Sequence, residues 1–328
     1  MNRTAVIIPN YNGIQYIEAC IDSLRRACEA SGPFDVIVVD NGSKDESLQY
    51  LKEQEETGFI RLIRLEENTG FAYAVNRGIE EADTEFVLLL NNDITIDEDL
   101  VKCLEESISS DERLFSVNAL MRSMSDPSVV DGAGDYYCAL GWAYAAYKGR
   151  DTASVRTAGD RHIFSACGGA SIYRKSILDR TGLFDEEHFA YLEDVDLGYR
   201  ARILGYRSLV CMKAGCDHAG SGFSGSRYNK FKIDLSAKNS IYIIYKNMPL
   251  LQIIINLPLL IAGFLIKTLF FAVKGYGKVY LRGLGKGFAL CASKKGRERK
   301  VRFKFNNLPN YVLIQIELWI NIIRRLLV

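Results

Sequence analysis

The stretch FVLLLNNDITID, residues 86–97, decides how we expect the chain to fold. Its first five residues form an apolar run with the length and composition of a buried strand. The run ends at Asn91-Asn92-Asp93, whose side chains require water, a hydrogen bond or a cation. An ordinary loop is one interpretation, because Asn and Asp favour turns. The other is a metal held at the carboxyl end of a parallel sheet, where α/β folds place their ligands.

Strand and helix patterns alternate through the first half of the chain. Such alternation predicts a mostly parallel sheet with helices on both faces. The expected strands are 4–8, 34–40, 60–65 and 86–91, and the expected helices are 14–29, 45–56, 71–81 and 97–109. Residues 112–170 are rich in Gly, Ala, Tyr and Ser and suit loops and short strands beside a cleft. A helix over 194–204 and a strand over 206–212 follow.

The composition describes a folded protein with a substantial core. Of the 328 residues 48% are hydrophobic, which argues against disorder. We expect no signal peptide, because Pro9 and Asn10 interrupt the first apolar run. The eight Cys are scattered without a CxxC pair, so we expect reduced thiols in the cytoplasm and neither a disulfide framework nor a zinc site.

The net charge of +1 hides a division along the chain. Residues 267–328 contain fourteen Lys and Arg but only two Glu, a formal charge of +12, while the other 27 basic and 38 acidic residues give −11. A basic tail on an acidic body predicts attraction to an anionic surface, with nucleic acid and lipid headgroups as candidates. No recognised nucleic-acid motif accompanies the tail, so we expect no nucleic-acid partner.

Polar residues follow each of the four predicted strands, in the segments PNYNG (9–13), DNGSKDES (40–47), ENTGFAYAVNRGI (67–79) and NND (91–93). Four such strand ends on one edge of a sheet describe a ligand crevice. PNYNG contains neither GxGxxG nor a phosphate-cradling GxxxxGK loop, which disfavours a dinucleotide dehydrogenase and an NTPase. Asp40 can accept from the N–H of a uracil or thymine ring, and Tyr11 can stack on it. Asp93 can bind a hard divalent cation that neutralises a departing diphosphate.

Five segments together resemble a family 2 glycosyltransferase of the GT-A fold, near the rhamnosyltransferase-like bacterial members. They are VIIPNYNG, VVDNGSKDES, NTGFAYAVNRGI, LLLNND and GGASIYRKSILDRTGLFDEEHFAYLEDVDLGYRARILGYR, in this order over roughly residues 4–220. The resemblance implies an α/β catalytic domain over 1–225, with a Rossmann-like, mostly parallel sheet flanked by helices. A helical, basic, membrane-associated extension would follow over 226–328.

The resemblance also implies the donor and metal sites. Asn91 replaces the first Asp of the family's DXD motif, which leaves Asp93 as the ligand of a divalent metal, Mg²⁺ or Mn²⁺. His218, within CDHAGSGFSG, would complete the metal site, and a structural role is its alternative. The implied donor-binding residues are Pro9, Tyr11, Asp40, Asn68, Gly70, Asn76, Asn91 and Asn92.

A second acidic group lies in YLEDVDLGYR (191–200). A single carboxylate there would suit an ordinary helix start. Glu193, Asp194 and Asp196, however, repel one another unless a cation or a proton offsets their charge. The resemblance makes Asp194 the catalytic base, which takes the proton of the acceptor hydroxyl in an inverting displacement at the sugar C1. Glu193 and Asp196 would orient it or bind the acceptor sugar. We expect the remaining two His, at 162 and 188, to have packing or surface roles.

The tail contains twenty uncharged residues between Lys246 and Lys267, enough to span a bilayer. A single crossing would place the +12 segment outside the cell, against the positive-inside tendency. Interrupting Asn, Gln and Pro residues favour an interfacial or re-entrant arrangement on the cytoplasmic face of the membrane. A buried helical subdomain or an oligomer interface is the alternative. The last segment, 311–328, is apolar with a polar stripe on one helix face.

These features predict a metal-dependent inverting glycosyltransferase for cell-surface polysaccharide synthesis. We expect dTDP-L-rhamnose as the donor and a lipid-linked glycan as the acceptor. A sugar nucleotidyltransferase would begin with a basic Gly-rich loop, and a processive synthase would carry QxxRW, and the sequence has neither. A non-catalytic protein of the same fold is disfavoured by the presence of Asp40, Asp93 and Asp194.

Overall fold

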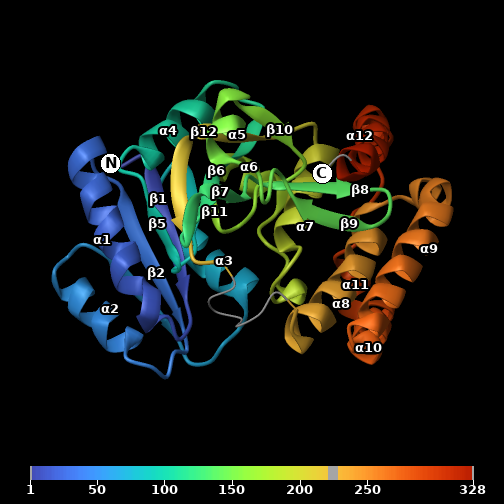
Figure 1. Ribbon diagram of the computed structural model, residues 1–328, viewed down its shortest axis with the longest axis horizontal. Helices are drawn as coiled ribbons and strands as arrows, with labels where there is room; N and C mark the ends of the chain where they lie inside the picture. The colour runs from blue at the N-terminus through green and yellow to red at the C-terminus, as the bar shows by residue number, and fades with distance from the viewer. Residues whose placement is uncertain (1, 221–227, 327–328) are drawn as a thin grey trace.

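The computed structural model describes residues 2–220 and 228–326. It contains a mixed sheet with helices on both faces and a group of C-terminal helices beside it (Figure 1). The main sheet runs in the order β10-β12-β6-β11-β4-β1-β2-β3. The predicted α/β class is therefore confirmed, with a parallel first half and a mixed second half.

The first four strands are parallel and follow the predicted alternation with helices. They are β1 (Thr4–Asn10), β2 (Asp35–Asn41), β3 (Arg61–Leu65) and β4 (Phe86–Leu90), and the helices are α1 (Ile14–Ser31), α2 (Ser47–Glu56), α3 (Phe71–Glu81) and α4 (Leu100–Ser109). Every side chain of β4 is buried, because one face of the strand packs with α1 and α4 and the other with α3. The apolar run that opened the analysis is thus a central strand that ends at the site.

The second half of the sheet differs from the prediction of loops and short strands over 112–170. β6 (Leu114–Ser123) is a ten-residue strand between β11 (Ala170–Arg174) and β12 (Arg207–His218). Its sequence shows no alternation because both faces are buried, and its polar side chains are hydrogen-bonded inside the protein: Ser116 to Ser208, and Asn118 to the backbone of Ala119 and Cys167. β12 continues beyond the predicted end of the strand at Met212.

Shorter elements complete this part of the chain. β5 (Ile94–Ile96) pairs with β12, β7 (Asp126–Gly132) with β6, and β10 (Arg161–Ile163) with β12, while β8 (Asp135–Cys138) and β9 (Trp142–Ala145) form a separate hairpin. The remaining helices are α5 (Thr152–Thr157), α6 (Lys175–Thr181) and α7 (Glu193–Ile203). All eight cysteines are free.

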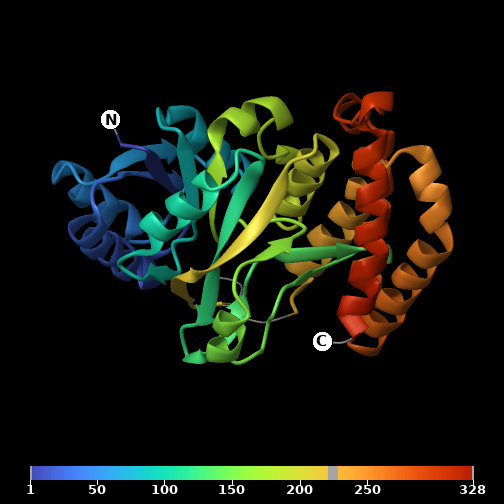
Figure 2. The same ribbon diagram turned by 90° about the horizontal axis from the view of Figure 1, so that it is seen from above.

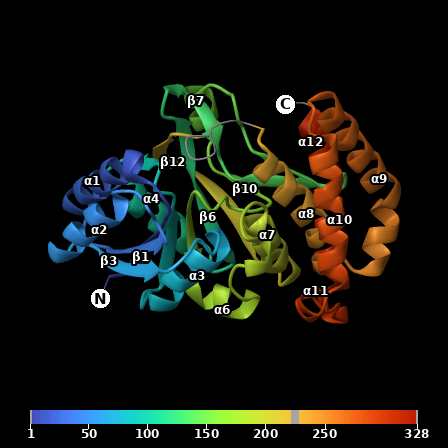
Figure 3. The ribbon, with the colours of Figure 1, turned by 90° about the horizontal axis from the view of Figure 1, so that it is seen from below.

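The C-terminal region is helical and lies against α7 and the β8–β9 hairpin (Figures 2 and 3). Its helices are α8 (Lys230–Asn247), α9 (Leu250–Val273), α10 (Gly277–Ala292), α11 (Lys294–Glu298) and α12 (Leu308–Leu326). Residues of both regions share one apolar cluster, including Phe164, Tyr199, Ile243, Leu260 and Leu318. The predicted domain boundary, at residues 225 and 226, lies outside the described residues.

Candidate active site

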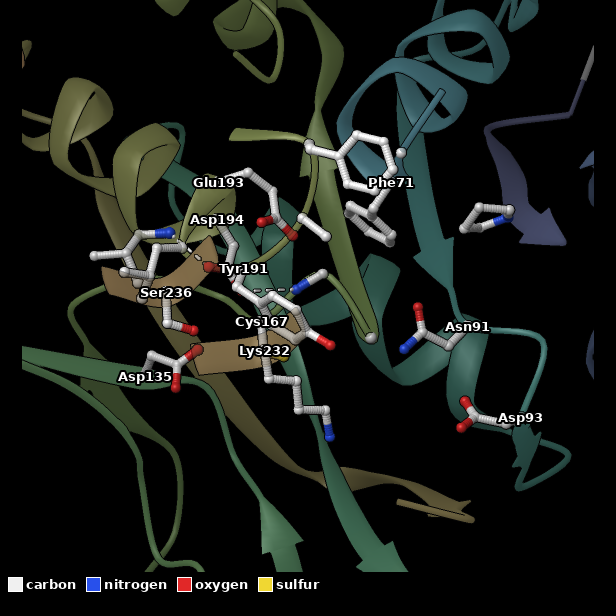
Figure 4. Close-up of a pocket in the computed structure, with 18 of the residues that line it drawn as sticks. Phe71, Asn91, Asp93, Asp135, Cys167, Tyr191, Glu193, Asp194, Lys232 and Ser236 are labelled. Carbon is white, nitrogen blue, oxygen red and sulfur yellow. Dashed lines mark hydrogen bonds between the residues drawn. The ribbon is translucent and has the colours of Figure 1, made fainter. Parts of the chain in front are cut away.

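A pocket of about 560 Å³ opens at the carboxyl ends of β1 and β4, where the strand-end segments were expected to meet. Figure 4 shows Asn91 and Asp93 on one side of this pocket, and Glu193, Asp194 and Asp135 on the other. Two acidic groups that are far apart in the sequence therefore face one cavity. Most of the predicted site residues line it, namely Pro9, Tyr11, Asn68, Gly70, Asn91, Asn92, Asp93, Glu193, Asp194 and His218.

Strand pairing brings Asp93 and His218 together. β5 pairs with the end of β12 so that Ile94 lies opposite His218, and Asp93 precedes Ile94 in the chain. His218 Nε2 lies 3.4 Å from Asp93 Oδ1, and His218 Nδ1 lies 2.7 Å from Asp131 Oδ2. Burial lowers the pKa of His218, but the hydrogen bond to Asp131 and the nearby charge of Asp93 outweigh this and raise the pKa to about 9 in the absence of a metal.

These residues fit a divalent metal. Asp93 Oδ1 is buried and makes no hydrogen bond of good geometry, so a strong acceptor faces the pocket unsatisfied. A ring nitrogen held by a carboxylate, as Asp131 holds Nδ1, is the usual partner arrangement of a metal-bound histidine. Asp93 and His218 Nε2 would therefore supply two ligands of a metal such as Mg²⁺ or Mn²⁺.

The opposite side of the pocket carries three carboxyl groups. Glu193 and Asp194 occupy the first turn of α7, and Asp135 comes from β8. The backbone N–H groups of Val195 and Gly168 donate to Asp194 at 2.7 Å and 3.3 Å, while Glu193 Oε2 is buried without a partner. The segment that leads into α7 is strained, with φ of 65° at Phe189, 68° at Tyr191 and 69° at Leu192. Such strain is concentrated at functional sites.

Burial raises the pKa of all three carboxyl groups. For Glu193 and Asp135 the charge of Asp194 adds to this, and both pKa values lie well above the usual range. The pKa of Asp194 is raised less strongly, because its backbone hydrogen bonds favour the charged form. Asp194 is therefore the member of the group best suited to be ionised and to accept a proton.

A comparison with models of known protein families shows which family the chain belongs to. The model of Glycosyl transferase family 2 matches residues 5–182, more than half of the chain. The chain belongs to this family. The GT-A fold expected from the sequence is likewise confirmed.

Two curated relatives show where the family 2 match lies. The chain is 34% identical over 95 residues to the teichoic acid poly(glycerol phosphate) polymerase of Staphylococcus epidermidis, covering 28% of this chain and 13% of that protein. It is 25% identical over 173 residues to the poly-beta-1,6-N-acetyl-D-glucosamine synthase of Staphylococcus aureus, covering 53% of this chain and 40% of that one. The chain thus spans less than half the length of these relatives.

Two solved structures share the fold of this family 2 chain. S. aureus TarS in complex with UDP-GlcNAc superposes with a TM-score of 0.59 at 18% identity, covering 90% of this chain and 83% of that one. The mannosyltransferase PcManGT from Pyrobaculum calidifontis, in complex with GDP-Man and Mn²⁺, gives 0.54 at 18% identity, covering 96% and 87%. At these identities the likeness concerns the fold.

Three predicted site residues of this family 2 chain lie outside the pocket lining. Asp40 is 1% exposed and accepts hydrogen bonds from the Asn10 side chain at 3.0 Å and the Ser43 backbone at 3.1 Å. It lies beneath the pocket and supports the loops above it. The Asn76 side chain is bonded to the backbone of Phe184 in both directions, which gives it a structural role instead of the predicted donor contact.

Asp196 is the third predicted site residue outside the pocket lining, because its side chain belongs to a buried ionic cluster. Lys246 Nζ lies 2.8 Å from Asp196 and 2.6 Å from Asp185, and Arg200 also pairs with Asp196. His188 adjoins the two carboxylates, so the group has the composition of a metal site. The Lys and Arg cations already neutralise it, so Asp196 serves the attachment of α7 to α8 and not the predicted role at the acceptor.

The sequence analysis missed several residues that line the pocket. Asp135 gave no signal because its hairpin lies in the irregular middle segment. Lys232 and Ser236 come from α8, in the region that was assigned to the membrane extension. Their positions show that the C-terminal region completes the pocket.

Proposed function

We propose that this chain transfers a glycosyl group, with inversion, from a nucleotide-diphosphate sugar to an acceptor hydroxyl. The arrangement of two opposed acidic groups in one pocket carries the proposal. The Asp93 and His218 side would hold a divalent metal, which supplies positive charge to the leaving diphosphate. The Asp194 side offers a proton acceptor to a hydroxyl that attacks from the opposite face of the sugar.

The residues of the chain divide the remaining work. Tyr11, Asn41 and Asn68 line the part of the pocket at the ends of β1, β2 and β3, where the nucleotide would lie. Gly168 leaves no room for a Cβ against the Phe71 ring, so backbone closely borders the space for the sugar. The N–H groups of Gly168 and Val195 orient Asp194, which would receive the acceptor proton.

We further propose dTDP-L-rhamnose as the donor and a lipid-linked glycan as the acceptor, in cell-surface polysaccharide synthesis. The resemblance to rhamnosyltransferase-like proteins supports the donor. The names of the two curated relatives, a teichoic acid polymerase and a polysaccharide synthase, support the class of product. Nucleotide sugars are cytoplasmic, so the reaction would occur on the cytoplasmic face of the cell membrane.

A screen of the purified full-length protein against nucleotide sugars tests the proposal. The panel contains dTDP-L-rhamnose, UDP-GlcNAc, UDP-glucose and GDP-mannose, with and without Mn²⁺ or Mg²⁺. Metal-dependent release of nucleoside diphosphate is expected, and fastest release from dTDP-L-rhamnose would support that donor. Faster release of nucleoside diphosphate from another nucleotide sugar would overturn dTDP-L-rhamnose as the donor but would still support glycosyl transfer. Binding without release from any donor would support a non-catalytic protein of the same fold.

A further inference from the structure

Helices α9 and α12 lie on one side of the molecule (Figure 2) and contact each other through Asn256 and Gln315, and both expose large apolar side chains. Among the described residues, α9 is the one helix long and apolar enough to cross a membrane by length and composition. Contiguous exposed apolar surface of this kind marks an interaction site. Its large exposed side chains, which define the apolar face, are Leu250, Leu251, Ile254, Ile255, Leu257, Ile261, Leu265, Ile266, Leu269, Val312, Leu313, Ile316, Trp319, Ile320 and Ile323.

Several polar side chains of the two helices are buried on the inside, beside the apolar residues that join the core, whereas the outward side chains of the apolar face are exposed to the surroundings. Asn256 of α9 and Gln315 of α12 are buried and exchange two hydrogen bonds, at 2.7 Å and 2.8 Å. Gln252 accepts from the Tyr199 hydroxyl at 2.8 Å, and Asn321 donates to the Tyr137 carbonyl at 2.8 Å. A helix that faces water shows the reverse distribution. The medium outside the apolar face is therefore expected to be apolar.

The contacts of α9 show how it would lie in a membrane. Gln252 contacts α7 and Asn256 contacts α12, while Gly263 accepts a hydrogen bond from Trp142 of the β8–β9 hairpin at 3.1 Å. Positions 252 to 263 extend about 16 Å along the helix axis. If α9 crossed a bilayer, α7 and the hairpin would be drawn into the hydrocarbon with their charged residues, at high cost.

Charge favours a lipid surface over a second copy of the chain. The segment 267–328 has a charge of +12 and the rest of the chain −11. Exposed basic residues neighbour the apolar face, among them Lys274 at the end of α9 and Arg324 and Arg325 on α12. Each basic residue near an anionic membrane contributes roughly 1 kcal/mol of attraction. In a homodimer through the same face, these like charges would approach one another.

We infer that the apolar face lies flat on an anionic bilayer, with α9 parallel to the membrane plane. The β8–β9 hairpin then connects the membrane to the active site, because Gly141 packs against Leu260 of α9 while Ala143 and Tyr144 line the pocket. A lipid-linked acceptor would thus reach the pocket beside this hairpin. That last step rests on the proposed function, whereas membrane binding itself does not.

Vesicle sedimentation of the full-length protein tests the binding surface without any transfer reaction. We expect binding to mixed phosphatidylcholine and phosphatidylglycerol vesicles, with weaker binding to phosphatidylcholine alone. High salt should release part of the protein and detergent all of it, because apolar burial is insensitive to salt. The double variant Leu265→Gln and Leu313→Gln should bind roughly tenfold to hundredfold more weakly. Met124→Gln, which changes an exposed apolar residue on another surface, should bind as wild type.

Donor hydrolysis by the double variant separates the two proposals. Both substituted side chains are more than half exposed and lie outside the pocket, so release of nucleoside diphosphate should be unchanged. If the double variant lost both vesicle binding and release of nucleoside diphosphate, misfolding would be the explanation, and circular dichroism would reveal it. The two single variants would then be tested in its place. Unchanged binding by a folded double variant would overturn the assignment of the apolar face. If the wild-type protein were a soluble dimer that does not bind vesicles, the partner of the apolar face would be a second copy of the chain and not a membrane.

Thiol labelling tests the orientation of α9. Lys274→Cys places a thiol at the end of α9, beyond any crossing by that helix. With protein bound to the outside of sealed vesicles, a membrane-impermeant maleimide should label this thiol before detergent is added, above the wild-type background. Labelling only after detergent would show that α9 crosses the bilayer and would overturn the flat orientation.

Discussion

Removing the Lys246 ammonium should destabilise the protein strongly, because this group joins the C-terminal helices to α7, the helix that carries Asp194. Lys246 is 4% exposed and pairs with two buried carboxylates, Asp185 and Asp196. Breaking a buried ion pair by removing one partner costs about 3–5 kcal/mol. Each carboxylate keeps another cation, Arg299 and Arg200 respectively, so we expect the lower end of this range for Lys246→Met.

A loss of about 3 kcal/mol corresponds to a fall in Tm of roughly 4 °C for a chain of 328 residues, because the unfolding entropy grows with chain length. Scanning calorimetry of wild type and Lys246→Met in the same detergent measures this difference in Tm. Lys286→Met is the matched control, because Lys286 also pairs with an aspartate, Asp234 at 2.5 Å, but is half exposed. Exposed pairs contribute about 1 kcal/mol or less. If Lys246→Met lowered Tm no more than the control does, the cluster would not attach α8 to α7 as described.

The acid dependence of this cluster has a defined sign. Burial alone would raise the pKa of Asp196, but Lys246 and Arg200 outweigh burial and hold the pKa far below its usual range. A carboxylate with a lowered pKa contributes stability at pH values above about 4, and this stability is lost as the pH falls further. The difference in stability between wild type and Lys246→Met should therefore be full at pH 7 and narrow only below about pH 4.

Three further outcomes are expected. His218→Ala should raise the metal concentration needed for donor turnover roughly tenfold to hundredfold, and an unchanged metal titration would return His218 to a structural role. Asp135→Asn should leave the acidic limb of the transfer rate nearly unmoved, because the raised pKa of Asp135 keeps its carboxyl group neutral where Asp194 ionises; a limb moved to lower pH would show that Asp135 carries a negative charge beside Asp194. Gly263→Ala should cost about 1–3 kcal/mol in unfolding experiments, since the backbone of the β8–β9 hairpin occupies the space of its Cβ. Gly285→Ala, in open space on α10, should instead stabilise by up to about 1 kcal/mol, and equal effects would refute the close approach.

The predictable part of the fold was the part with local patterns. β1 to β4 are short apolar runs that end in polar loops, and each is followed by a helix pattern, so their order and parallel pairing follow from general rules. β6 lacks such a pattern because it is buried on both faces and contains polar side chains whose partners come from distant segments. No local window of the sequence reveals those partners.

The same limit applies to the site. Asp93 and Asp194 each stand in a distinctive motif, and the structure brings both to one pocket. Asp135 lies near Asp194 only because of the placement of the β8–β9 hairpin. Asp196 pairs instead with Lys246, which comes from α8 much later in the sequence. The polar residues within the apolar run of α9 were visible as interruptions, but their inward direction depends on the packing of α12 against them.

The central claim is that Asp194 accepts the proton of the acceptor hydroxyl. The direct test compares wild type with Asp194→Asn in single-turnover transfer to an acceptor glycan, with donor affinity measured separately by titration. The substitution keeps the size of the side chain but removes the proton acceptor. We predict a rate lower by on the order of 10²–10⁴-fold with nearly unchanged donor affinity. A turnover close to that of wild type would contradict the account and would require another carboxyl group, Glu193 or Asp135, as the base.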